Sequence, residues 1–599
     1  MSNKLLAAAL LPWAAFAQNS TDPTSITIYN RVEQPLTSAL APVEVITKAD
    51  IERRQPRSLV DLLETLPGMQ FGSQNGGIGQ SSSLFVRGTN SDHVLVLLNG
   101  RPMAQMVSSN VDFSQLPVNN VQRIEYIRGP RAAIYGSRAI GGVVNIITTS
   151  QVNDATVGVT TGSNDYYAAN ASINQWVSDA TRLQLATGYR ETRGYDVVPS
   201  NSQNDRDGFD SKNLTLGIEH QLNQNWTLDA NFNGWENNLE YDFYEPVWGT
   251  PGSDKNHTEA YQLDTGLKYT SDQLSGQLNA SYGEYESEDW NKESGRHTAS
   301  ITNTSTTRLD GLVQYHYSEQ GYVLTGMDWD RDRLKAKTTG TRAPDRDNTG
   351  VYASVYHTWA PVSFELTGRV DDNEQFGTHD TWQSALSLAL PMRHKATLSY
   401  GTAFKAPTFS HLYGFGGNKD LKPEESENWE FGLAGDYELM DWQVNFYRNK
   451  IDDLIVYQGG YINSTKNTDA LIRGIELVAN VETGPVHHAF SYDYTDAENE
   501  NNNGRQLLRR AKRKFSWTGD IDVASASLFA QVLYVGERTD VGDVMLPSYT
   551  IWNIGARYPL TSNLTLNGKV NNLFDKDYQV VDGYDAPDME FYVGVDYRF

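Results

Sequence analysis

Hydrophobic and polar residues follow one pattern up to about Ser150 and a different one beyond it. In the first part, the apolar runs Val94–Leu98 and 143–147 are flanked by turn residues, which predicts short buried strands. Apolar positions between residues 49 and 66 recur at helical spacing and end at Pro67-Gly68, which predicts one short amphipathic helix. Together these elements predict a compact mixed α/β domain.

After Ser150, apolar and aromatic residues recur at every second position, which is the periodicity of strands with one apolar face. Residues 183–186, 214–218 and 564–570 show this alternation, and it continues through Phe591, Val593, Val595, Tyr597 and Phe599 at the end of the chain. Long polar stretches such as 200–212, 245–258 and 498–505 separate the predicted strands. A soluble array of β-sandwiches or a propeller would alternate in the same way, so the pattern alone leaves those alternatives open.

The amino-acid composition argues against several classes of function. The chain has 49 Lys and Arg against 74 Asp and Glu, a net charge of −25, which disfavours nucleic acid as a partner because phosphate binding needs a basic surface. It contains no cysteine, which excludes disulfides, Cys-ligated metal centres and thiol nucleophiles. Only 39% of the residues are hydrophobic, too few for a helical membrane protein.

The first 17 residues have the features of a secretory signal peptide. Lys4 precedes an apolar run over residues 5–17, and Ala15-Phe16-Ala17 has the form of a cleavage site. This run is shorter than the roughly 18 to 20 residues that a membrane helix needs, and no longer apolar run follows it. The exported chain is therefore expected to be soluble or a β-barrel, since a closed barrel also satisfies its backbone in lipid.

The abundance of aromatic residues and the long polar connections favour an outer-membrane barrel. Aromatic residues make up 11% of the chain, and barrels of this class carry aromatic girdles, short turns on one side and long loops on the other. At roughly 20 residues per strand and connection, the part after Ser150 suffices for about 22 antiparallel strands, the size class whose lumen is plugged. The fold class expected is an all-β membrane barrel with a small mixed α/β domain inside it.

A series of motifs in the first 150 residues resembles the plug domain of TonB-dependent outer-membrane transporters. They are Leu66-Pro67-Gly68, Val86-Arg87-Gly88, RIEYIRGP at 123–130, YGS at 135–137 and IGGVVNI at 140–146; FKAP at 404–407, LKPE at 421–424 and NLFDKDY at 572–578 add barrel motifs. The resemblance implies a signal peptide at 1–17, a periplasmic leader at 18–30, a plug at 31–150 and a barrel at 151–599. It also implies a monomer in contact with the lipid of the bacterial outer membrane.

Within this family, loop motifs most resemble those of the cobalamin (vitamin B12) transporters. These motifs are FVRGTN at 85–90, GYDVV at 194–198, DRDGF at 205–209, QFG at 375–377, TWQ at 381–383, LYGF at 412–415 and LLRRAK at 507–512. The resemblance implies cobalamin as the transported ligand, not as a cofactor. The alternatives are another ligand of the same family, such as a siderophore, and, in a different class, a passive porin or adhesion barrel.

Acidic residues in two neighbouring predicted loops form a candidate calcium site. The set is Asp196, Gln203, Asp205 and Asp207 in the first loop and Tyr241, Asp242 and Asp254 in the second. Calcium takes six to eight oxygen ligands, and two such loops could bring enough of them together. From the residues alone, solvated acidic loops are the favoured interpretation; it is the resemblance to cobalamin transporters that implies a structural calcium ion here.

The candidate ligand surface consists mainly of neutral polar residues. Cobalamin is large and amphipathic and carries amide arms, so its pocket needs neutral hydrogen-bonding groups among apolar contacts. The resemblance implies ligand contacts from the plug apex and from two barrel positions: Ser81, Ser83, Asn90, Ser108, Ser109, Thr302 and Arg509.

Nothing in the sequence predicts catalysis or the use of ATP. There is no phosphate-binding loop, no H-E-x-x-H and no G-x-S-x-G, so an enzyme is not expected and energy for transport would come from outside. In this family a Ton box pairs by β-addition with the TonB protein. The resemblance places it at Thr24, Ser25, Ile26, Thr27, Ile28, Tyr29 and Asn30.

Overall fold

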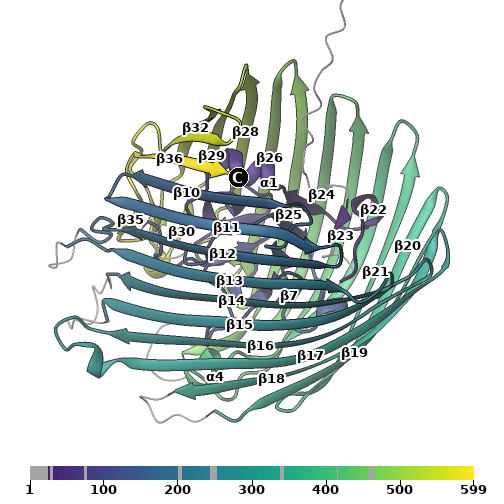
Figure 1. The fold of residues 1–599 in the computed structure, drawn as a ribbon. Helices are drawn as coiled ribbons and strands as arrows, with labels where there is room; N and C mark the ends of the chain where they lie inside the picture. Colours follow the sequence, from purple (N-terminus) through teal and green to yellow (C-terminus); the bar gives the residue numbers. More distant parts are fainter. Residues whose placement is uncertain are drawn as a thin grey trace, which may run out of the picture.

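The computed structural model describes residues 25–26, 31–72, 77–199, 205–242, 253–336, 343–414, 416–457 and 464–599, and shows a closed β-barrel around a small mixed α/β domain (Figure 1). The predicted signal peptide lies outside these residues. Among the helices in these ranges, none combines the length and the apolarity needed to cross a bilayer.

The inner domain, here called the plug, is built on a five-stranded sheet in the order β3-β8-β9-β6-β7. Its elements are β1 (Ser25–Ile26), β2 (Gln34–Pro35), β3 (Val43–Ile46), α1 (Lys48–Arg54), α2 (Val60–Leu63), β4 (Met69–Phe71), β5 (Leu84–Val86), β6 (Val94–Leu98), β7 (Arg101–Pro102), β8 (Arg123–Arg128), α3 (Ala132–Tyr135) and β9 (Gly142–Ile147). The two predicted apolar strands are confirmed as β6 and β9, and they pair in parallel at the centre of the sheet.

The prediction of one helix between residues 49 and 66 is wrong, because the chain forms two helices there. Thr47 caps α1 through a reciprocal pair of hydrogen bonds with Asp50, and α1 ends at Gln55, which is left-handed at φ 49°. Pro56 follows and cannot continue a helix, since it lacks an N–H group and restricts the residue before it. The leucines of α2 still reach the plug core, where Leu62 and Leu63 are buried.

The barrel has 22 long antiparallel strands, as predicted. They are β10 (Asp154–Gly162), β11 (Tyr166–Ser178), β12 (Thr181–Thr192), β13 (Phe209–Gln221), β14 (Trp226–Glu240), β15 (Lys255–Thr270), β16 (Leu274–Trp290), β17 (Ser300–Ser318), β18 (Gly321–Ala336), β19 (Arg346–Trp359), β20 (Val362–Asn373), β21 (Gly377–Leu390), β22 (His394–Lys405), β23 (Glu424–Tyr437), β24 (Met440–Tyr457), β25 (Thr465–Thr483), β26 (Val486–Asn499), β28 (Arg513–Val523), β29 (Ala526–Val535), β32 (Tyr549–Pro559), β33 (Leu564–Asn571) and β36 (Glu590–Arg598). β10 pairs with β36 and closes the barrel.

The two ends of the barrel differ in their connections. At the end that holds the C-terminus, turns of two to four residues join the strands, such as 179–180 and 222–225. The other end carries most of the long connections, which include the short elements α4 (Phe409–Tyr413), β27 (Arg505–Gln506), β30 (Arg538–Thr539), β31 (Met545–Leu546), β34 (Gln579–Val581) and β35 (Tyr584–Asp585). Long loops on one side and short turns on the other are typical of outer-membrane barrels.

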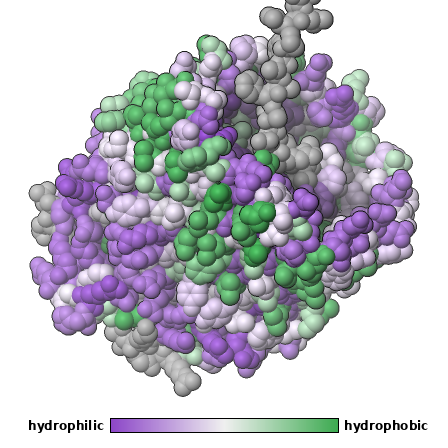
Figure 2. Space-filling view, viewed as in Figure 1, coloured by the Kyte–Doolittle hydropathy of each residue, from purple (hydrophilic) through white to green (hydrophobic). Residues whose placement is uncertain are grey.

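Alternation along each strand separates an apolar outer face from a polar lumen. On β36, Phe591, Val593 and Tyr597 are exposed on the outside, whereas Glu590 and Tyr592 are buried inside. Figure 2 shows hydrophobic side chains in patches over the outer surface of the barrel. The predicted outward face of the last strand is therefore confirmed, and the sandwich and propeller alternatives are excluded by the closed barrel.

Buried ion pairs join the plug to the barrel wall. Arg87, at the end of β5, donates to Glu430 of β23 at 2.8 Å and to Glu476 of β25 at 2.7 Å. Arg128 at the end of β8 shares Glu476 at 3.2 Å and also contacts Glu44 of β3 at 2.6 Å. A charge this deeply buried is tolerated only when it is paired and hydrogen-bonded, so these pairs require the plug to sit in one position.

We expect Arg87→Ala to weaken the docking of the plug. Removing one partner of a buried ion pair costs about 3–5 kcal/mol, because Glu430 and Glu476 would lose their shared counter-ion. Hydrogen exchange of the plug amides in the detergent-solubilised protein measures this loss. The control is Arg473→Ala, since Arg473 is half-exposed and pairs with Asp496 on the surface, where an ion pair contributes about 0–1 kcal/mol. Equal exchange in the two variants would contradict the prediction.

Candidate ligand and cation site

Two neighbouring connections at the long-loop end bring three aspartates together. Residues 193–208 join β12 to β13, and residues 241–254 join β14 to β15. One carboxylate oxygen each from Asp196, Asp207 and Asp242 lies within 4.8 Å of the other two. Asp207 and Asp242 are only 6% and 2% exposed, so this is a partly enclosed cluster of negative charge rather than a solvated acidic loop.

The first of these connections is held in shape by its own backbone and by two buried valines. The Asp207 side chain accepts a hydrogen bond from the Val197 N–H at 2.9 Å, and the Asp207 N–H donates to the Tyr195 carbonyl at 3.1 Å. Val197 and Val198 are buried against Val581 and Tyr584 of a neighbouring connection. The hydrogen bond from Val197 and the burial of Val197 and Val198 therefore hold Asp196 and Asp207 close to each other.

The other predicted calcium ligands have different partners. Asp205 pairs with the Lys292 ammonium group, and Asp254 accepts the Lys292 N–H at 2.7 Å. The Tyr241 hydroxyl donates to Asp289 at 3.2 Å. Gln203 lies outside the described residues. Lys292, on the connection after β16, is a neighbour of the cluster that sequence reasoning missed, because it stands 38 residues beyond Asp254 in the chain.

Burial and repulsion from neighbouring carboxylates raise the pKa of Asp207. Its pKa is raised to about 7 from an ordinary 3.8 by loss of solvent first, and then by the charges of Asp242, Asp205 and Asp196; the Val197 hydrogen bond opposes the rise. A divalent cation would remove this repulsion. Three carboxylates offer up to six hard oxygen atoms, the ligand type and roughly the number that calcium prefers, so the donor set fits that ion.

At the plug apex, Asn90 joins the plug to two parts of the barrel. Its amide nitrogen donates to the Ile455 carbonyl of β24 at 3.0 Å, and its oxygen accepts from Arg510 at 2.7 Å. The Arg510 guanidinium also lies 3.8 Å from the centre of the Phe85 ring. Arg509, the predicted ligand contact, instead pairs with Asp540 at 2.6 Å. The arginine of the LLRRAK motif that contacts the plug is therefore Arg510, which the sequence did not distinguish from Arg509.

The remaining candidate ligand residues lie on two segments of the plug and one barrel strand. Ser81 and Ser83 precede β5, while the Ser108 hydroxyl bonds Asn110 in the connection after β7. That connection contacts β17, where Thr304 donates to the Gln105 carbonyl at 2.6 Å. Thr302 is two residues from Thr304 on the same strand face. Thr302 thus lies on the same face of β17 as the residue that contacts Gln105.

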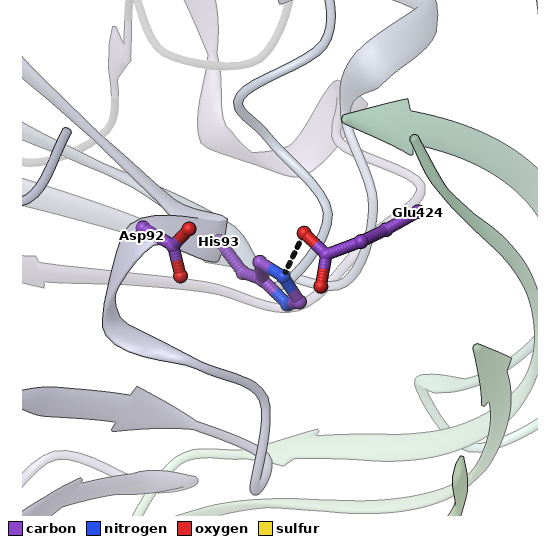
Figure 3. A group of neighbouring side chains, drawn as sticks. All are labelled: Asp92, His93 and Glu424. Carbon is purple, nitrogen blue, oxygen red and sulfur yellow. Dashed lines mark hydrogen bonds and ion pairs between the residues drawn. The ribbon is translucent and has the colours of Figure 1, made fainter. Parts of the chain in front are cut away.

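A second cluster, Asp92, His93 and Glu424, lies where the plug apex meets β23 (Figure 3). The His93 Nε2 atom is 3.0 Å from Glu424, and all three side chains are buried. The Lys405 ammonium group bonds Asp92 and lies 3.8 Å from Glu424. Because a lysine already provides the positive charge between the two carboxylates, this cluster joins plug and barrel and is not a vacant cation site.

Of the predicted Ton box, only Ser25 and Ile26 are among the described residues, as strand β1 paired with β2. Thr24, Thr27, Ile28, Tyr29 and Asn30 lie outside them. Arg31, the next described residue, donates to Asp310 on the barrel wall at 2.6 Å. The leader is thus attached to the lumen directly after the predicted Ton box.

Comparison with protein families agrees with this architecture. Residues 35–143 match the TonB-dependent receptor plug domain, and residues 147–573 match the TonB-dependent receptor-like β-barrel. The chain belongs to the TonB-dependent receptor family. It is therefore an outer-membrane receptor whose long connections are extracellular and whose short turns are periplasmic.

Solved structures of the same fold include several siderophore receptors. The siderophore receptor PirA from Acinetobacter baumannii is 19% identical, with a TM-score of 0.81 over 93% of this chain and 98% of that chain. A ferric enterobactin receptor mutant from Pseudomonas aeruginosa in complex with enterobactin is 18% identical, with a TM-score of 0.81 over 94% and 100%. FpvA from P. aeruginosa bound to a pyoverdine is 14% identical, with a TM-score of 0.79 over 98% and 89%. At these identities the similarity establishes the fold alone.

The raised pKa of Asp207 gives a prediction for cation binding. Without a cation, the folded pKa of about 7 lies above the ordinary 3.8, so the folded state holds a proton that the unfolded chain releases. The stabilisation from this proton is present below the unfolded pKa and is lost as pH rises through about 7. Calcium needs the ionised form, so we expect binding to release protons near pH 6 and almost none near pH 8. Calorimetry in buffers of different ionisation enthalpy measures this release.

The matched control for that prediction is Asp205, whose carboxylate is committed to Lys292. We expect Asp207→Asn to abolish proton release and to weaken calcium binding at least about tenfold, as when metal-site residues are lost. Asp205→Asn should have a smaller effect on both quantities. Equal effects of the two substitutions would count against the three-aspartate site.

Proposed function

We propose that this receptor imports cobalamin across the outer membrane in a TonB-dependent manner, with calcium ordering the extracellular loops that capture it. The observation that carries the proposal is the convergence of Asp196, Asp207 and Asp242 from two connections. These are loop positions that the resemblance to cobalamin transporters implies for calcium. A bound cation would hold both connections in place beside the barrel mouth.

The chemistry of the plug apex supports a ligand with many neutral hydrogen-bonding groups. Ser81, Ser83, Asn90, Ser108 and Ser109 offer hydroxyl and amide groups and no charge. Phe85 and Arg510 stack on each other beside Asn90, so an aromatic ring and a guanidinium group lie next to that amide. Such a mixture suits a large amphipathic molecule with amide arms, because orientation then comes from many neutral contacts.

Active transport is proposed because the lumen is filled and the chain has no ATP-binding motif. Buried pairs such as Arg87–Glu476 hold the plug in the barrel, which argues against a passive porin. Opening the lumen requires work on the plug, and pairing of the leader strand with TonB is the route by which the family receives it. The transmembrane potential that energises TonB supplies about 2.3 kcal/mol per charge per 100 mV.

A siderophore is the second candidate ligand, and the comparison with solved structures favours it. PirA is a siderophore receptor, and a P. aeruginosa relative was solved in complex with enterobactin. Ferric catecholate siderophores are anionic, so the acidic cluster at the barrel mouth would disfavour them electrostatically.

We expect purified receptor to bind cyanocobalamin in millimolar calcium, and chelation to weaken that binding. Equilibrium titration of the detergent-solubilised protein measures it, with ferric enterobactin as the comparison ligand in the same buffers. Asp207→Asn should reproduce the effect of chelation, and Asp205→Asn should change affinity less. Binding of ferric enterobactin but not cyanocobalamin would replace the first candidate by the second.

Deleting residues 24–30 is expected to abolish uptake and to leave binding unchanged. The deletion removes the predicted strand donor for TonB but no residue of the extracellular mouth. Cell-associated and periplasmic radiolabelled cyanocobalamin are measured in cells that produce each form. Uptake equal to that of the intact receptor would reject TonB-dependent transport.

A further inference from the structure

A cavity of about 270 Å³ runs between the plug and the barrel wall at the seam where the barrel closes. Its periplasmic part is lined by Asp154 of β10 and Arg598 of β36, and its plug side by Lys48 and Glu52 of α1. Figure 1 shows α1 beside the C-terminal end of the chain. The cavity therefore begins near the periplasmic rim and follows the first and last barrel strands inward.

Small residues on the lumen side of the seam explain this space. Thr156 and Thr160 of β10, Gly188 of β12 and Gly594 of β36 line the cavity, and Thr160 stands opposite Gly594 in the strand register. The short side chains of Thr156 and Thr160 leave room beside them, whereas at Gly188 the plug lies close, since a Cβ atom there would be 3.1 Å from Asn119. Water can occupy the space, because the charged and amide groups along it offer hydrogen bonds.

A second cavity, of about 100 Å³, continues toward the extracellular side. It is lined by Asp61 and Glu64 of the plug and by Tyr578 and Asp588 of the last extracellular connection. Arg57 lines both cavities. The two spaces thus lie on either side of one side chain, along the same seam.

Arg57 is fixed in this position from both sides. On the plug it donates to Asp61 at 3.1 Å; on β36 it bonds Glu590 and donates to the Tyr592 hydroxyl at 2.8 Å. Its guanidinium also lies 5.0 Å from the centre of the Tyr592 ring. An arginine in such a fork has little freedom, so it forms a stable constriction between the cavities.

We infer that Arg57 is the gate of a polar path for small hydrated ions along the closure seam, between plug and barrel. In the resting receptor the bonds from Arg57 to Asp61, Glu590 and Tyr592 block this path. Displacing Arg57 joins the two cavities and lets ions pass while the rest of the plug stays in place. This inference does not depend on which ligand the receptor imports.

The test is the conductance of Arg57→Ala for potassium and chloride ions in a planar lipid bilayer. Alanine removes the constriction, so we expect discrete current steps that the unmodified receptor lacks. Heat-modifiable migration in gel electrophoresis checks that the barrel has folded. Tyr592→Ala is a second variant, which removes one hydrogen bond and the ring contact that hold Arg57 on the barrel side and leaves its pairs with Asp61 and Glu590 in place.

Arg54→Ala is a closely matched control. Arg54 and Arg57 are each 15% exposed, pair with barrel carboxylates that are 10% and 7% exposed, and stack at 5.2 Å and 5.0 Å on an aromatic ring. Arg54 lines neither cavity. We therefore expect it to remain non-conducting. Equal currents from Arg54→Ala and Arg57→Ala would mean general loosening of the plug and would overturn the inference.

A single cysteine locates the current. Because the chain has no cysteine of its own, Thr160→Cys in the Arg57→Ala background gives one reactive thiol, inside the larger cavity. A charged thiol reagent should then reduce the conductance, and it should have no effect on Arg57→Ala alone. Current unaffected by the reagent, or folded Arg57→Ala and Tyr592→Ala proteins that both fail to conduct, would show that the seam is not the path.

Discussion

In hydrocarbon, each unpaired backbone N–H or C=O group costs several kcal/mol, so a sheet inside a membrane tolerates no free edge. β10 and β36 remove the last two edges of this sheet by pairing with each other from Thr156–Arg598 to Gly162–Tyr592. Closure of 22 strands leaves a lumen too wide for barrel side chains to fill. The plug follows from that constraint, because an open lumen of this width would be an aqueous channel.

Filling a polar lumen with a folded domain buries many charges, and the structure compensates them across the plug–barrel boundary. Arg87 is shared by Glu430 and Glu476, Lys405 by Asp92 and Glu424, and Arg57 by Asp61 and Glu590. Such pairs contribute little net stability compared with apolar packing, but a misplaced partner is costly. They therefore fix where the plug sits in the barrel.

The extracellular end has the opposite electrostatic character. Asp196, Asp207 and Asp242 bring three carboxylates together, whereas Asp205 pairs with the Lys292 ammonium group and Asp254 accepts the Lys292 backbone N–H. The carboxylates of this cluster repel one another. Protonation reduces this repulsion at low pH, and a bound divalent cation would reduce it at neutral pH. In the proposed function, an external ion would organise this pair of loops, whereas internal counter-ions hold the plug in the barrel.

The sequence by itself determined the strands, because alternation at period two is a local property that survives without tertiary contacts; the choice of a barrel over a sandwich or a propeller came from the aromatic content, the long polar connections and the family motifs. Residues 214–218 and 591–599 revealed strands, and 94–98 revealed a buried one, in each case from their own side chains. Local sequence also contained the helix break that our prediction overlooked, since Pro56 lies between Ile51 and Leu59, inside the predicted helix. The plug and barrel motifs were equally contiguous and equally recognisable.

Tertiary structure decided which polar residues meet. Glu424 reaches His93 across 331 residues and Asn90 reaches Arg510 across 420, distances at which spacing carries no information. The closed barrel places Arg510, rather than Arg509, against the plug. The connection after β16 brings Lys292 to Asp205 and Asp254. Periodicity predicts which face of a strand each residue lies on. Which residues meet across the lumen depends on the register of the barrel strands and on the position of the plug, and no single segment of the sequence determines either.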